Sequence, residues 1–83
     1  MDEDSDRVRK LRWLCRRGMK ELDILLERFV DREQAALAAG AWPGLEVLLD
    51  AEDDLLWDML QNPALPQAGP HVGLLESIRS VSA

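Results

Sequence analysis

Residues 13–23 decide the fold, and they read Trp13-Leu14-Cys15-Arg16-Arg17-Gly18-Met19-Lys20-Glu21-Leu22-Asp23. Apolar residues recur at helical spacing on both sides of Gly18, which indicates that one helix ends here and another begins. Glycine often follows the end of a helix because it adopts a positive φ without a Cβ clash. The stretch therefore predicts a corner between two helices, where Gly18 permits either a positive φ or a close approach of the backbone.

The segment before this corner is expected to form a first helix over residues 6–17, with Ser5 or Asp6 as its N-cap. At 100° per residue, one arc of this helix carries an apolar stripe of Val8, Leu11, Leu14 and Cys15. The opposite arc carries one aromatic and four basic side chains, Arg9, Arg12, Trp13, Arg16 and Arg17. Trp13 therefore lies among cations, where either a partner protein covers it or the arginine stems bury it.

The segments after the corner also carry apolar residues at helical spacing, and none alternates with the period of two that marks a strand. Four more helices are expected, over residues 19–38, 42–50, 54–61 and 71–80. Pro43 is tolerated in a first helical turn, and Asp53 or Asp54 is the expected cap of the fourth helix. Three prolines make residues 62–70 a loop. In the last helix the expected inward residues are Val72, Leu75 and Ile78.

The pattern as a whole predicts an all-α fold, a small five-helix bundle. The chain has 83 residues, so we expect one domain over residues 1–83, with residues 1–5 as a flexible tail. A chain of this length buries about 60–65% of the surface that its unfolded form exposes, which leaves little room for a buried catalytic pocket. No apolar run approaches the roughly 20 residues of a membrane span, and the acidic N-terminus does not resemble a signal peptide. We therefore expect a cytoplasmic protein without membrane insertion.

Basic residues are concentrated in residues 7–20, which carry seven cations and no acid. The rest of the chain carries all 16 acidic residues against three arginines, and the net charge is −6. This separation favours a basic face that meets an acidic or polar partner. The alternative is that the arginines cover a solvated helix face.

Few side chains of this chain could carry chemistry. Cys15 is the single cysteine and His71 the single histidine, which excludes an intrachain disulfide and a four-ligand zinc site. Cys15 is expected in the core and His71 at the surface. The acidic run at residues 50–54 lacks the EF-hand spacing, so helix capping and solvation explain it. The sequence has no Gly-rich dinucleotide fingerprint, so we expect no catalytic residue, no metal site and no FAD bound by this chain.

The corner combines residue types that favour protein recognition. Arg16 and Arg17 carry planar groups with several donors, suited to carboxylates and carbonyl oxygens, and Trp and Arg are enriched in interface hot spots. An ordinary helix corner, in which the arginines pair with Glu21 and Asp23, is the competing interpretation. The residue types alone leave both open.

The same stretch resembles the signature of the FAD assembly factors of succinate dehydrogenase, a family of small five-helix proteins. The family motif Arg-Gly-x-x-Glu is matched by Arg17-Gly18-Met19-Lys20-Glu21, with Trp13 before it and Leu22-Asp23 after it. A weaker likeness returns at Leu48-Leu49 and at residues 53–57, an acidic turn followed by a helix that bears a tryptophan. Residues 38–44 depart from the family pattern, so the third helix is expected to be short or displaced.

The resemblance implies an assembly factor, not an enzyme. Such a factor binds the flavoprotein subunit of succinate dehydrogenase and promotes covalent attachment of FAD to a histidine of that subunit, with the fumarate reductase flavoprotein as a second candidate client. This chain is then expected to be a monomer without a cofactor of its own. The expected partner-binding residues are Arg9, Arg12, Trp13, Arg16, Arg17, Gly18, Glu21 and Asp23. Arg17 and Glu21 are expected at exposed positions, where replacement changes binding more than stability.

The main alternative is a small nucleic-acid-binding or regulatory module that uses the basic first helix. Seven cations with one aromatic could follow a phosphate backbone. The chain as a whole is acidic, however, and an acidic bundle repels DNA. We therefore favour the assembly factor and expect no nucleic-acid partner.

Overall fold

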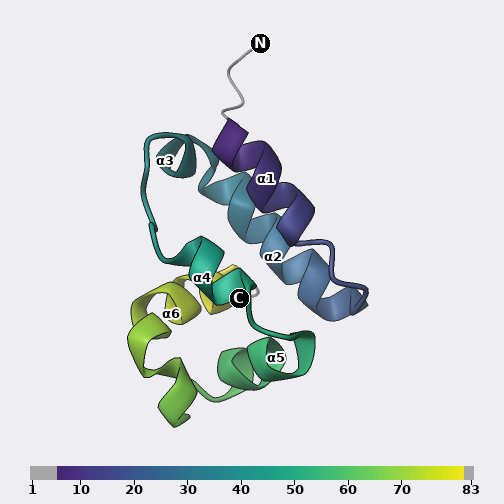
Figure 1. Ribbon diagram of the computed structural model, residues 1–83, viewed down its shortest axis with the longest axis vertical. Helices are drawn as coiled ribbons and strands as arrows, with labels where there is room; N and C mark the ends of the chain where they lie inside the picture. Colours follow the sequence, from purple (N-terminus) through teal and green to yellow (C-terminus); the bar gives the residue numbers. More distant parts are fainter. Residues whose placement is uncertain (1–5, 82–83) are drawn as a thin grey trace.

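The computed structural model describes residues 6–81, and most of them are helical, with no strand in that range (Figure 1). The α-helices are α1 (Asp6–Leu14), α2 (Lys20–Arg32), α3 (Gln34–Ala38), α4 (Leu45–Leu49), α5 (Asp53–Gln61) and α6 (Val72–Ser80). A 3-10 helix, η1 (Pro66–His71), leads directly into α6. The all-α prediction is confirmed, with six short α-helices in this part of the chain instead of five. The proposed cap at Ser5 and the tail at residues 1–5 lie outside the described residues.

The helices form two groups that share one core. α1 and α2 make an antiparallel pair joined at the Gly18 corner and lie side by side in Figure 1. α3 packs against α1, whereas α6 packs against α2, α5 and η1. Within residues 6–81, no helix combines the length and the apolar character needed to cross a bilayer.

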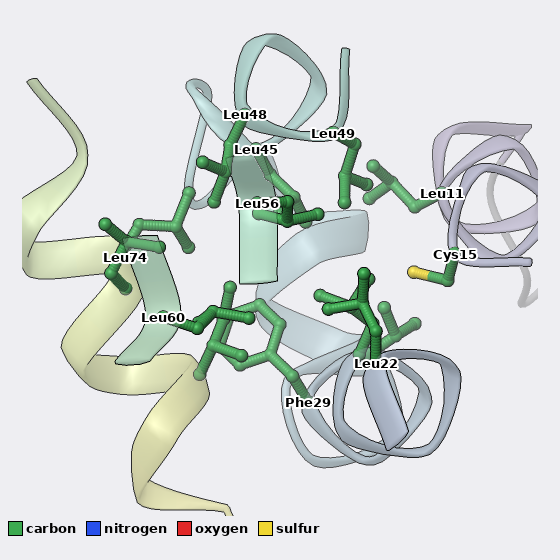
Figure 2. Close-up of a cluster of buried hydrophobic side chains, with 14 of the residues drawn as sticks. Leu11, Cys15, Leu22, Phe29, Leu45, Leu48, Leu49, Leu56, Leu60 and Leu74 are labelled. Carbon is green, nitrogen blue, oxygen red and sulfur yellow. The ribbon is translucent and has the colours of Figure 1, made fainter. Parts of the chain in front are cut away.

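One hydrophobic cluster forms this core, and every helix contributes to it (Figure 2). Phe29 of α2 is fully buried, and the Trp42 ring packs edge-on against it with a centroid distance of 6.1 Å. Cys15 is buried and directs its sulfur toward the cluster, so the prediction of a core cysteine is confirmed. Helical spacing therefore located most of the core.

One expected core position is wrong in α6. Val72 is 37% exposed, whereas Leu74, Leu75 and Ile78 are buried. At 100° per residue, Val72 lies roughly 110° from the centre of the arc that these three residues share. The side chain of Val72 therefore points away from the core.

The first helix ends earlier than expected, at Leu14. The N–H of Cys15 is shared between the carbonyls of Leu11 (3.0 Å) and Arg12 (3.3 Å), and the N–H of Arg16 donates to the carbonyl three residues back (3.1 Å). This tightening to 3-10 geometry is common at helix ends. The chain then leaves the helix, so residues 15–17 do not continue its faces.

The segment expected as one helix over residues 19–38 is divided at Glu33. The divided helix allows α3 to turn toward α1. The third expected helix is indeed short, because α4 covers only Leu45–Leu49. Before it, Gly40 (φ 101°) and Trp42 (φ 56°) are both left-handed, so Pro43 lies in a turn outside the helix.

Two further local predictions are wrong. Glu52 is the N-cap residue of α5, and Asp53 is the first residue of the helix, without a side-chain cap hydrogen bond at this end. The expected loop at residues 62–70 contains most of η1, which starts at Pro66, a residue whose fixed φ suits a first helical turn. Ala68 of η1 is fully buried, which anchors this segment on the core.

Candidate functional site

A carboxylate from within α2 holds the backbone of the Gly18 corner. Asp23 accepts the N–H of Arg17 (2.7 Å) with one oxygen and the N–H of Gly18 (3.2 Å) with the other. Gly18 has a φ of 95°, which is the first of the two possibilities that the sequence left open. A Cβ built on Gly18 meets no atom within 4 Å, so φ, not space, requires glycine here. Asp23 thus stabilises the corner through backbone hydrogen bonds, and not through the arginine side-chain pairs that the ordinary-corner interpretation expects.

Arg17 points into the molecule, so its predicted exposure is wrong: its side chain is only 11% exposed. Its Nε donates to Asp53 Oδ1 at 2.6 Å. Its terminal nitrogens donate to the carbonyls of Leu14 (3.1 Å), Leu49 (2.7 Å) and Ala51. The helical projection failed because α1 ends before Arg17. This arginine joins the corner to the junction between α4 and α5.

Arg7 makes a similar connection that the sequence did not indicate. It donates to the carbonyls of Leu37 (2.7 Å), Ala41 (2.6 Å) and Trp42 (2.6 Å), and its Nε donates to Glu46 at 2.9 Å. The hydrogen bond from Arg7 holds the pKa of Glu46 below its ordinary value. Arg7 therefore ties α1 to the irregular segment before α4.

Three side chains at the corner face outward. Trp13 is 72% exposed, which confirms that it lies away from the core. Arg16 and Glu21 are exposed, and neither has an ion pair within the part of the chain that the structure describes. Because Trp and Arg are enriched in interface hot spots, these outward side chains are candidates for contact with a partner protein.

Other arginines of the first helix are occupied by acids of this chain. Arg12 donates to Asp31 near the end of α2 (2.7 Å) and to Gln34 at the start of α3 (3.2 Å), and Arg9 pairs with Asp6. With Arg7 and Arg17 turned inward, the seven cations of residues 7–20 do not form one free basic face. This arrangement gives no support to a nucleic-acid-binding helix.

Cys15 and His71 give no sign of reactive chemistry. Burial raises the pKa of the Cys15 thiol to about 12, and a thiolate is the reactive form. His71 is half-buried at the junction of η1 and α6. Among residues 6–81, no group of three or more potential metal-ligating side chains comes together.

The predicted site side chains at the corner thus fall into two groups. Trp13, Arg16 and Glu21 are exposed at or beside the corner, whereas Arg17 and Asp23 hold the corner from inside. Arg9 and Arg12 lie earlier in α1 than Trp13, and both are in ion pairs. The sequence around Arg17 did not indicate that its side chain turns inward, because its partner Asp53 is 36 residues away.

The chain is similar to known proteins along most of its length. A family model described as "Flavinator of succinate dehydrogenase" matches residues 9–82. The FAD assembly factor SdhE of Coxiella burnetii is 39% identical over 75 residues, which cover 90% of this chain and 92% of that protein. The FAD assembly factor SdhE of Xylella fastidiosa is 36% identical over 83 residues, 100% of this chain and 84% of that protein. No solved structure matches this chain significantly.

Proposed function

The chain belongs to the family of succinate dehydrogenase flavinators, and we propose that its Gly18 corner docks on the flavoprotein subunit of succinate dehydrogenase. The relatives are named FAD assembly factors, so this chain is an assembly factor that promotes covalent attachment of FAD. The observation that supports the docking surface is the contrast at the corner. Trp13 and Glu21 are exposed, while Arg17 and Asp23 hold the backbone below them.

We assign different roles to the two groups of side chains at the corner. Trp13, Arg16 and Glu21 contact the partner, because their side chains are exposed. Arg17 and Asp23 act indirectly, because they fix the position of the corner. A corner that is already fixed favours binding, because fewer groups of this chain lose conformational freedom when the complex forms.

The mechanism requires no catalytic group on this chain. The flavin and the acceptor histidine of the partner supply the bond-forming chemistry. If this chain binds the conformer of the flavoprotein in which flavin and histidine are aligned, the population of that conformer rises and attachment becomes faster. Binding energy at the corner is then the source of the acceleration.

Three finer points belong to the same proposal. The chain acts as a monomer, it binds free FAD weakly or not at all, and the fumarate reductase flavoprotein is a second client. The lack of a dinucleotide fingerprint in the sequence supports the second point. Titration of the purified protein with FAD tests it, and sub-micromolar binding would contradict it.

The experiment for the docking surface compares two glutamates of α2. Glu21 belongs to the motif, whereas Glu27 is an exposed glutamate on another face of the same helix. We expect Glu21→Ala to reduce covalent flavin on the partner in a strain lacking this protein, read as in-gel fluorescence after denaturation. Glu27→Ala is the matched control and is expected to behave as wild type. Full flavinylation with Glu21→Ala would show that the corner is not the working surface.

A further inference from the structure

A groove of about 300 Å³ lies between α2 and α5, and its lining includes Glu21, three residues after Gly18. Its lining consists of Glu21, Ile24, Leu25, Arg28, Trp57 and Gln61. Ile24 is 41% exposed, although it is a large apolar residue in the middle of a helix. Leu25 and Trp57 are half-buried and pack against the core, so they form an apolar floor.

The size of the groove limits what it can hold. An apolar cavity of about 150 Å³ binds a molecule of benzene. A groove twice that size, open to solvent on one side, takes one large aliphatic or aromatic side chain. It is too small for the apolar face of a whole helix, which presents several such side chains over successive turns.

Charged side chains at the rim of the groove indicate which residues of a partner would flank the apolar side chain. Glu21 and Arg28 are both exposed, and neither has an ion pair within residues 6–81. They are two helical turns apart, about 10 Å along α2. About three residues of an extended chain span this distance.

We propose that this groove receives one large apolar side chain from an extended segment of the flavoprotein, in which a basic residue faces Glu21 and an acidic residue faces Arg28. This inference rests on the proposed function and extends the docking surface, because Glu21 belongs both to the motif and to the rim of the groove. The corner supplies one contact region, and the α2–α5 groove supplies a second, whose lining residues other than Glu21 lie outside the motif.

The test measures the affinity of the full-length protein for the purified flavoprotein by isothermal titration calorimetry. Ile24→Glu places a charge on the apolar wall at a partly exposed position, and we expect it to raise the Kd at least tenfold. Val47→Glu is the matched control, because Val47 is an exposed β-branched residue on α4, outside the groove. We expect the control to bind within threefold of wild type and both variants to keep a wild-type melt. A loss smaller than tenfold for Ile24→Glu overturns the proposal.

A second variant tests the rim charge independently of the apolar wall. Arg28→Glu leaves the apolar lining unchanged and reverses the charge that faces the acidic residue of the partner. We expect a rise in Kd of at least fivefold at low salt, which shrinks at high salt because screening weakens the repulsion. Equal affinity for Arg28→Glu and wild type would overturn the assigned charge pattern.

These outcomes are separable from failure of the proposed function. If wild type binds the flavoprotein and Glu21→Ala weakens it, but Ile24→Glu does not, the docking function stands and the groove proposal is wrong. If wild type itself neither binds nor promotes flavinylation, the proposed function fails. A second copy of this chain in the groove would appear as a dimer in sedimentation equilibrium that Ile24→Glu abolishes, and this too would overturn the proposal.

Discussion

Replacement of Arg17 by alanine removes the connection between the Gly18 corner and the α4–α5 junction. The change deletes an ion pair with Asp53 (2.6 Å) and the donors for three backbone carbonyls, including that of Leu49 (2.7 Å). The Arg17 side chain is 11% exposed, so water only partly replaces these partners. We therefore expect a large effect on stability, in contrast to the small effect that an exposed arginine would give.

The expected loss of stability is estimated from the groups that Arg17→Ala leaves without a partner. A hydrogen bond to a charged group contributes about 1.5–3 kcal/mol, and loss of one member of a buried pair costs about 3–5 kcal/mol. Asp53 is 35% exposed and can be rehydrated, which lowers the estimate. We expect Arg17→Ala to reduce the free energy of unfolding by about 3 kcal/mol. For a domain of this size, that loss lowers Tm by roughly 12–24 °C.

The assay is thermal and urea unfolding followed by far-UV circular dichroism. Arg16→Ala is the matched control, because the neighbouring arginine is exposed and has no ion pair within residues 6–81. We expect the control to change stability by about 0.5 kcal/mol or less. Arg17→Lys should be intermediate, since one ammonium group cannot reach Asp53 and the carbonyls of Leu49 and Ala51 together. If Arg17→Ala and Arg16→Ala melt alike, the structural role of Arg17 is refuted.

Four further predictions follow from the same structure. Trp13→Ala should leave Tm unchanged and weaken flavoprotein binding by about 2 kcal/mol, because the side chain is 72% exposed. A large fall in Tm would show that Trp13 stabilises the fold and would contradict its role as a partner contact. Gly18→Ala should cost about 1 kcal/mol in urea unfolding because its φ is 95°, with Gly18→Asn recovering part of the loss; no cost for alanine would contradict the strain argument. Cys15 should react with a disulfide reagent far more slowly in the native protein than in urea, since burial raises its pKa to about 12, and equal rates would count against its burial. The lowered pKa of Glu46 contributes stability that is present above the ordinary value of 4.5 and is lost as the pH falls through the folded-state value. Glu46→Gln should therefore flatten the acid limb of the stability–pH curve, and parallel curves for the two proteins would exclude that contribution.

Local sequence patterns predicted several features of this structure. The apolar spacing on both sides of the corner predicted buried Leu11, Cys15 and Leu22, and the glycine just past a helix end indicated a position that permits the positive φ of Gly18. The arc opposite the apolar stripe predicted that Trp13 lies away from the core, and its exposure agrees with this. These predictions succeeded because helical periodicity and glycine conformation depend on residues within one or two turns.

Only the tertiary structure decided how the charged side chains are used. Arg7 and Arg17 belong to the basic segment, yet each turns inward to a carboxylate, Glu46 or Asp53, that lies 39 or 36 residues away. No local pattern marks such a pair, because a long arginine side chain can reach any acid that packing brings within hydrogen-bonding distance. Local sequence patterns predicted most of the helical segments and apolar faces and placed a motif at the corner, but they did not predict the end of α1 or the division between α2 and α3. The packing of α4 and α5 against that corner decided that the motif arginine supports the surface from within, while Trp13 and Glu21 remain exposed for a partner.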